Sequence, residues 1–160
     1  MSDLRVGIGV DAHAFGEGVP LVLGGVSFPG EPGLAGHSDG DVLAHALTDA
    51  ILGAAGLADI GWLFPSDDEQ WRGADSIDLL VRAYEVVREA GYELVNADCV
   101  LIGQRPRIAA RRDEMRARLA GALGLGPELV TVRATTTDRL GFTGREEGLA
   151  AQAVALVRRS

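Results

Sequence analysis

A loop that leads into an amphipathic helix constrains this chain most. After Gly36, apolar residues recur at the spacing of one helix face, which predicts a helix from about Gly40 to Ala55. The residues of this face are Leu43, Leu47, Ala50, Ile51 and Ala54. Asp41, His45 and Asp49 are four apart, so they share the opposite stripe, which we expect to face solvent or a functional site. Ser38 and Asp41 fit a capping box, and we interpret Asp41 as a helix cap rather than a metal ligand.

The order of the other segments predicts an α+β fold. In chain order they are strands at 5–15 and 20–26 that form a hairpin, the helix at 40–55, an ordered surface loop at 58–68, a helix that begins at Asp75 or Ser76 and ends before Gly91, a strand at 94–102, a helix from Pro106 to near Gly124, and a strand at 129–136. The alanines of residues 148–158 favour a helix, yet an alternating strand pattern also fits. The length predicts one domain over residues 1–160.

Charge and residue usage exclude several classes of protein. The net charge of −8 argues against a partner that is a nucleic acid or an anionic membrane surface. The chain contains no lysine, which excludes Schiff-base chemistry and a P-loop lysine. Cys99 is the one cysteine and lies in an apolar run, which indicates packing in a reducing compartment. No segment has the length of a membrane span or the layout of a signal peptide, so we expect a cytoplasmic protein.

The three histidines all precede residue 46 and suggest a metal site. Asp11 and His13 project from one face if their segment is extended, and His45 would come from the helix. This is a plausible zinc set of three ligands with a fourth position left for substrate. The alternative is that Asp11 orients His13 inside a core and that His45 is solvated or hydrogen-bonded.

A second group of polar residues ends the strand at 129–136. The hydroxyls of Thr135, Thr136 and Thr137 can hold phosphate oxygens, and the Asp138 carboxylate can hold Mg²⁺. Threonines on an edge strand are the alternative reading. A further question concerns the aromatic residues near the 58–68 loop, which either cap the core or face a ligand. They are Trp62, Phe64 and Trp71.

Four motifs in order resemble the 2-C-methyl-D-erythritol 2,4-cyclodiphosphate synthase family, and the resemblance covers nearly the whole chain. The motifs are GIGVDAHAF at 7–15, GHSDGDVLAHALTDA at 36–50, DIGWLFP at 59–65 and ATTTDRLGFTGR at 134–145. The resemblance implies an α+β domain with a mixed β-sheet covered by helices on one face. It also implies that the last segment is a strand, and that the protein is a homotrimer with active sites between neighbours.

The implied reaction is cyclisation of 4-diphosphocytidyl-2-C-methyl-D-erythritol 2-phosphate with release of CMP, in the non-mevalonate isoprenoid pathway. By the same resemblance, zinc binds Asp11, His13 and His45, and Mg²⁺ or Mn²⁺ binds Asp138. Thr136 would stabilise transition-state charge, while His37 and Ser38 would place the 2-phosphate. Erythritol would contact Asp59, Ile60, Gly61, Phe64, Pro65, Ser66, Asp67 and Asp68. Cytidine would be recognised across a subunit boundary by Gly103, Gln104, Arg105, Pro106, Arg107, Ile108 and Ala109, with Thr135 and Thr137 as further substrate contacts.

The resemblance also implies an axial cavity near Phe142 and Arg145, which in relatives accepts isoprenoid diphosphates. Two departures from the family matter here. Asp138 stands where relatives usually have Glu, and Gln152 replaces a Glu that often partners the axial Arg, which leaves Arg145 less neutralised. Two other functions remain open. They are a zinc phosphohydrolase that releases inorganic phosphate and a non-catalytic trimer that binds nucleotides or isoprenoids.

Overall fold

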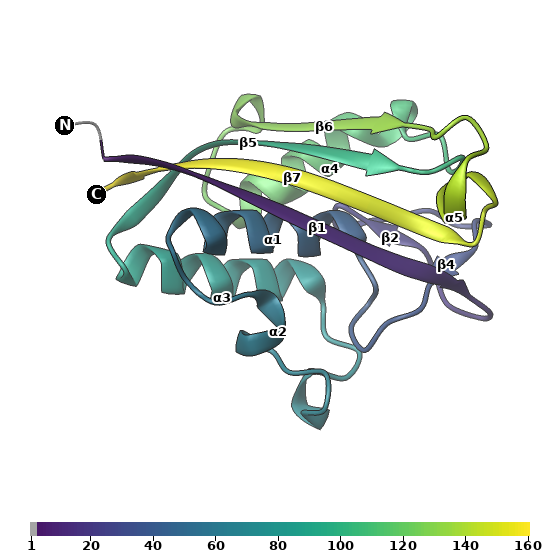
Figure 1. The fold of residues 1–160 in the computed structure, drawn as a ribbon, viewed down its shortest axis with the longest axis horizontal. Helices are drawn as coiled ribbons and strands as arrows, with labels where there is room; N and C mark the ends of the chain where they lie inside the picture. Colours follow the sequence, from purple (N-terminus) through teal and green to yellow (C-terminus); the bar gives the residue numbers. More distant parts are fainter. Residues whose placement is uncertain (1–2) are drawn as a thin grey trace.

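A mixed sheet of five strands is the centre of the computed structural model, which describes residues 3–160 (Figure 1). Its strand order is β4-β1-β7-β5-β6, and only the β5–β6 pair is parallel. The strands are β1 (Leu4–Gly16), β4 (Gly33–Leu34), β5 (Tyr92–Ile102), β6 (Val130–Thr135) and β7 (Gly148–Arg159). The predicted α+β class and mixed sheet are confirmed. Residues 1 and 2 of the domain expected over 1–160 lie outside the described range.

The ambiguous last segment is the strand β7, which pairs with β1 on one side and β5 on the other. Its alternate residues are buried, including Ala151, Ala153, Ala155 and Val157. Ladder hydrogen bonds on both edges satisfy its backbone, so tertiary pairing outweighs the helix propensity of its alanines. The strand expectation taken from the family is confirmed.

Two glycines of β1 let the first helix, α1 (Val42–Ala54), lie directly on the sheet. A Cβ atom at Gly9 would lie 1.9 Å from the Ala46 carbonyl oxygen, and one at Gly7 would lie 2.1 Å from that of Ala50. Only glycine tolerates so close an approach of two backbones. Asp11 follows on the same face of β1, so the contact brings the helix to the polar end of the strand.

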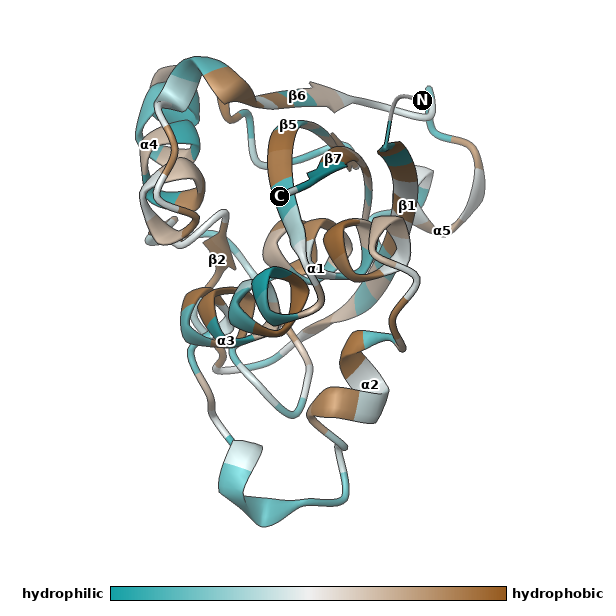
Figure 2. Ribbon diagram, turned by 90° about the vertical axis from the view of Figure 1, so that its left-hand side faces the viewer, coloured by the Kyte–Doolittle hydropathy of each residue, from teal (hydrophilic) through white to brown (hydrophobic). Residues whose placement is uncertain are grey.

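The helices α1, α3 (Ser76–Glu89) and α4 (Arg112–Ala122) lie on one side of the sheet, as Figure 2 shows. The opposite side carries exposed apolar side chains on β1 and β7. Val6, Ile8, Val10 and Val154 are 68%, 59%, 64% and 43% exposed. An exposed apolar strip of this kind is typical of a contact surface.

Three expectations about the fold are wrong. The predicted hairpin of 5–15 with 20–26 does not form: β2 (Val22–Leu23) pairs with β3 (Val26–Ser27) around Gly24 and Gly25, whose positive φ angles suit a two-residue turn. The loop at 58–68 contains the one-turn helix α2 (Ile60–Leu63). The helix expected from Pro106 begins six residues later, after a loop that contains buried Ile108 and a 3₁₀ turn at 109–111.

Short turns complete the element order. They are the 3₁₀ turns η1 (Glu69–Trp71), η2 (Ala109–Arg111) and η3 (Pro127–Leu129), and the one-turn helix α5 (Gly141–Gly144). Cys99 is fully buried in β5, and burial raises the pKa of its thiol to about 12, which confirms that it packs in the core. No helix in the described residues has the length and apolar character needed to cross a bilayer.

Asp41 caps α1, as expected, but it is fully buried rather than exposed on a polar stripe. Its carboxylate accepts hydrogen bonds from the backbone N–H groups of Gly24, Gly25 and Ala44. Burial raises the pKa of Asp41 to about 6, although these donors oppose the shift. The capping box with Ser38 is wrong, because Ser38 Oγ accepts from the Gly40 N–H and turns toward His45.

Candidate metal-binding site

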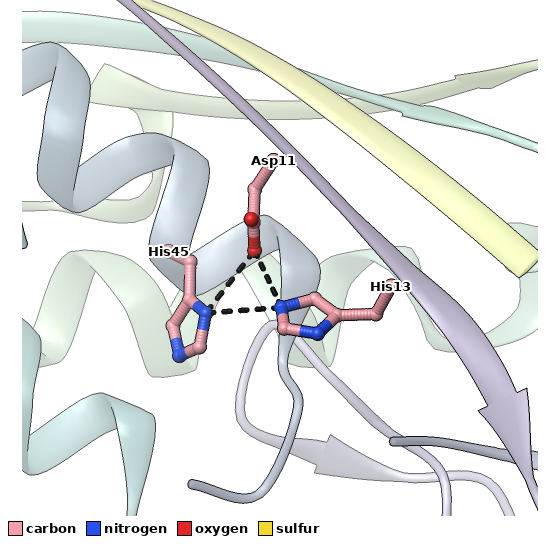
Figure 3. Close-up of side chains that lie close together, drawn as sticks. All are labelled: Asp11, His13 and His45. Carbon is pink, nitrogen blue, oxygen red and sulfur yellow. Dashed lines mark hydrogen bonds and ion pairs between the residues drawn. The ribbon is translucent and has the colours of Figure 1, made fainter. Parts of the chain in front are cut away.

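Asp11, His13 and His45 converge on one point between β1 and α1 (Figure 3). Asp11 Oδ2 lies 2.8 Å from His13 Nε2 and 3.1 Å from His45 Nδ1, and the two nitrogens are 3.3 Å apart. Asp11 and His13 share the helix-covered face of β1 because they are two residues apart on the strand. The sequence-based prediction that these three residues come together is therefore confirmed.

The chemistry of this cluster fits a divalent cation. Four ligands at about 2.0 Å from a tetrahedral zinc ion are about 3.3 Å from one another, which is close to the separations in the triad. His13 Nδ1 lies 2.8 Å from the Ala35 carbonyl oxygen and must donate to it, so in the neutral ring His13 Nε2 presents a lone pair to the cluster. Two nitrogens and a carboxylate oxygen thus face one another at ligand spacing.

The electrostatics of the triad hold Asp11 ionised. Its partial burial raises the pKa of Asp11, but hydrogen bonds and charge from the two imidazoles outweigh burial and lower that pKa to about 2. The hydrogen bond to Asp11 in turn raises the pKa of His13. The ionised Asp11 carboxylate therefore favours a cation or a proton at the cluster.

A cavity of about 170 Å³ opens beside the triad. Its walls combine polar groups from the loop before α1 with apolar groups from α2, η1 and α3. The lining residues are His13, His37, Ser38, His45, Ile60, Gly61, Phe64, Ser66, Trp71 and Leu79. Phe64 and Trp71 pack edge to face with their ring centroids 4.9 Å apart, whereas Trp62 is 72% exposed and outside this lining. The sequence did not identify Leu79 as a lining residue, because an apolar side chain within a helix is expected in the core.

Other residues expected to contact erythritol lie around the cavity. Asp59 caps α2, with Oδ1 accepting from the Trp62 N–H at 2.9 Å. His37 Nε2 lies 3.0 Å from the Asp68 carbonyl oxygen, so the 64–68 loop rests on His37. Pro65 and Asp67 belong to the same loop but are not among the lining residues.

The segments expected to bind cytidine and the second metal form a separate group at the ends of β5 and β6. The Gly103 N–H donates to the Thr135 carbonyl oxygen at 3.0 Å, so the two segments lie side by side. A second cavity of about 480 Å³ is lined by Phe28, Pro29, Glu31, Gln104, Arg105, Pro106, Arg107 and Arg111. Within residues 3–160, neither segment lines the cavity beside the triad.

The Thr135–Asp138 segment is exposed except for half-buried Thr137. The Thr135 and Thr136 hydroxyls bond within the segment, whereas the Thr137 hydroxyl bonds to residues beyond it. Thr136 Oγ1 donates to Asp138 Oδ1 at 3.2 Å, and Thr137 Oγ1 donates to the Leu140 carbonyl oxygen at 2.6 Å. Asp138 has a φ of 52°, in the left-handed region that aspartate tolerates better than most residues. These contacts shape a turn that presents a carboxylate and a hydroxyl to solvent.

Phe142 and Arg145 lie next along the chain, in and just after α5. Phe142 is 41% exposed. Arg145 forms an ion pair with Glu147 of the same chain, which raises the pKa of Arg145. Within this chain Glu147 gives Arg145 a partner, and the expectation that Gln152 leaves Arg145 less neutralised than in relatives stays a prediction.

Comparison with known proteins assigns this arrangement to a family. A profile of the YgbB family matches residues 4–158. A 2-C-methyl-D-erythritol 2,4-cyclodiphosphate synthase of Rubrobacter xylanophilus is 60% identical over the whole chain and 98% of its own length. The chain belongs to this family of synthases. The synthase of Geobacillus thermodenitrificans is 53% identical over 98% of both chains.

Solved structures of the synthase family share the fold. The bifunctional IspDF of Campylobacter jejuni superposes with a TM-score of 0.96 at 46% identity, over all of this chain and 43% of that longer one. Plasmodium falciparum IspF in complex with CDP superposes with a TM-score of 0.85 at 29% identity, over all of this chain and 99% of its own. The expected family and the single α+β domain are thus confirmed.

Proposed function

We propose that this protein converts 4-diphosphocytidyl-2-C-methyl-D-erythritol 2-phosphate to 2-C-methyl-D-erythritol 2,4-cyclodiphosphate and CMP, as a phosphorus–oxygen lyase of the non-mevalonate isoprenoid pathway. The observation that carries the proposal is the Asp11–His13–His45 cluster, set beside a cavity in a chain 60% identical to a synthase over its full length. We take residues 1–160 as one synthase domain that acts in the cytoplasm.

In this proposal Asp11, His13 and His45 hold Zn²⁺, and Asp138 holds Mg²⁺ or Mn²⁺. Zinc would supply a Lewis acid that polarises a phosphoryl oxygen and a template for the diphosphate. The net charge of the chain is −8, so local cations also explain how it could accept so anionic a substrate.

The protein groups would mainly position the substrate and neutralise its charge, since phosphoryl transfer needs little covalent help. His37 and Ser38 line the cavity next to the triad, where they would orient the 2-phosphate for attack on the β-phosphorus. The P–O bond to CMP breaks as the new P–O bond forms. The Thr136 hydroxyl would donate to the charge that develops on the transferred group.

The apolar walls of the same cavity would exclude water from the reaction. Ile60, Gly61, Phe64 and Ser66 would surround the erythritol, with Pro65, Asp67 and Asp68 in the loop behind them. One oxygen of Asp59 caps α2, which would leave the other free to accept from an erythritol hydroxyl.

A homotrimer would unite the two groups of residues that one chain keeps apart. The loop from Gly103 to Ala109, with Thr135 and Thr137, would recognise cytidine for the triad of a neighbouring subunit. Support comes from the apolar strip of β1 and β7, which leaves Val6, Ile8 and Val10 more than half exposed. Phe142 and Arg145 would approach the axis, where a cavity could accept an isoprenoid diphosphate.

A phosphorus NMR time course with the diphosphocytidyl substrate and Mg²⁺ tests the proposal, run on zinc-loaded and chelator-stripped protein. The expected result is a cyclic diphosphate together with CMP only in the zinc-loaded sample. Release of inorganic phosphate would instead identify a zinc phosphohydrolase. Substrate binding without turnover in either sample would identify a non-catalytic binding protein.

A further inference from the structure

The nitrogen of His45 that faces away from the triad contacts two serine hydroxyls. His45 Nε2 lies 2.8 Å from Ser76 Oγ and 3.1 Å from Ser38 Oγ. Ser76 is the first residue of α3 and is fully buried, whereas Ser38 is half-buried in the loop before α1. The shorter of the two contacts therefore comes from the more buried serine.

The Ser76 hydroxyl hydrogen is committed to another group. Ser76 Oγ donates to Asp39 Oδ1 in a short hydrogen bond, and the Ser76 backbone N–H donates to Asp39 Oδ2 at 3.0 Å. Asp39 Oδ1 also accepts from the Asp41 N–H at 3.0 Å. A hydroxyl has one hydrogen, so Ser76 can present only a lone pair to His45.

When a cation occupies the triad and His45 is neutral, this commitment selects the tautomer of His45. Because Ser76 Oγ can only accept, His45 Nε2 must carry the hydrogen of this contact. In the neutral ring the other nitrogen, Nδ1, is then unprotonated and directed at the triad. Hydrogen bonds to the distal nitrogen of a ligating histidine commonly serve this purpose and raise ligand basicity.

The same residues join two parts of the chain around the cavity. The Asp39 N–H donates to the Ala74 carbonyl oxygen at 3.1 Å, and the Gly73 N–H donates to that of His37 at 2.7 Å. The loop before α1 is thus tied to the start of α3, and Ser76 cannot turn away from His45 without breaking the contacts of Asp39. These hydrogen bonds hold the Ser76 hydroxyl beside the His45 ring.

We propose that Ser76 and Asp39 are positioning residues for metal binding, which act through His45 and hold its Nδ1 unprotonated toward the cation. The inference rests on the metal site of the proposed function and assigns no contact with substrate to either residue. It predicts that the Ser76 hydroxyl contributes to zinc affinity even in the absence of substrate.

Zinc affinity, measured by competition with a chromogenic chelator in substrate-free protein, tests this role. Ser76→Ala keeps the backbone bond to Asp39 and should weaken zinc binding about 10- to 100-fold. Ser38→Ala is the matched control. It removes the longer contact to the same nitrogen and should therefore weaken zinc binding less than Ser76→Ala. Asp39→Asn removes the charged acceptor and gives a second variant, expected to weaken binding in the same direction.

Two further measurements separate positioning from a structural role. Metal-free Ser76→Ala should remain folded at the temperature of the zinc assay, as checked by thermal unfolding, and nitrogen NMR of the zinc-loaded protein should show a protonated His45 Nε2. Unaltered zinc affinity in Ser76→Ala and Asp39→Asn, or a larger loss in Ser38→Ala, would overturn the inference. Failure of the unaltered protein to bind zinc would contradict the proposed function as well, so the two failures are distinguishable.

Discussion

The Asp11–His13–His45 triad and the Thr135–Asp138 segment are both expected to hold a cation, yet they are built in opposite ways. The triad lies between a strand and a helix, and its histidines have hydrogen-bond partners on both ring nitrogens. Thr136 and Asp138 are exposed and bond to each other. One chain therefore brings the three triad side chains together by itself, whereas the segment presents its carboxylate and hydroxyl to solvent.

The largest effect should come from His45→Ala, which removes a ligand from the triad. We expect cyclisation to fall about a thousandfold or more, because metal ions contribute several kcal/mol of transition-state stabilisation. The subunit should stay folded, since the apolar face of α1 is unaltered. Cyclisation rate, zinc content and size-exclusion chromatography check this, with Asp113→Ala at a 97% exposed carboxylate as control. Loss of folded protein would mean that His45 is structural, and it would remove the difference between the triad and the Thr135–Asp138 segment.

The next largest effect tests the scaffold beneath the triad. Gly9→Ala would place a methyl group 1.9 Å from the Ala46 carbonyl oxygen, so α1 must move off the sheet. We expect the free energy of unfolding in urea to fall by about 1–3 kcal/mol or more, with weaker zinc binding as His45 shifts. Gly53→Ala is the matched control, because its nearest neighbour is 3.9 Å away and alanine favours a helix. Equal stability of the two variants would contradict this view of the β1–α1 contact.

The sequence predicted the residues of the triad because local periodicity carries the information. Because Asp11 and His13 are two residues apart on a strand, they must share a face. The spacing of the apolar residues predicts the helix that carries His45. The close packing of α1 on β1 was not predicted, because no local pattern shows that Gly7 and Gly9 face the backbone of a helix. Helical spacing placed Asp41 on the polar stripe, although it is fully buried, because spacing gives no information on how deeply the start of a helix is buried.

Long-range pairing is the part that local patterns missed. Nothing in residues 20–26 distinguishes pairing with β1 from the small β2–β3 hairpin, and the alanines of β7 alone favour a helix. Ser76 and Asp39 escaped notice for the same reason. They are 37 residues apart, and only the packing of α3 against the loop before α1 brings them to His45. The exposed Thr135–Asp138 segment offered polar residues at a strand end, but no periodicity to say which site they serve.

Thr136→Ala tests the exposed Thr135–Asp138 segment rather than the triad. The hydroxyl is exposed and bonds only to Asp138 and its backbone, so its loss should leave zinc content and thermal unfolding unchanged. We expect the cyclisation rate to fall about 10²- to 10³-fold, the range for removal of one donor to developing charge. Single-turnover rates and metal analysis check this. A variant that loses zinc would show that the segment supports the triad directly.

The smallest effect should come from Asp138→Glu, which introduces the residue that the family resemblance leads us to expect at this position. The longer side chain should keep or improve the dependence of cyclisation on Mg²⁺, because it reaches further without loss of charge. A small cost in stability is expected, since glutamate tolerates the φ of 52° less well than aspartate. Titration of the rate with Mg²⁺ checks this, with Asp138→Asn as a control that removes the charge. An inactive glutamate variant would mean that the turn is shaped around the shorter acid, and that the exposed segment is as closely built as the triad.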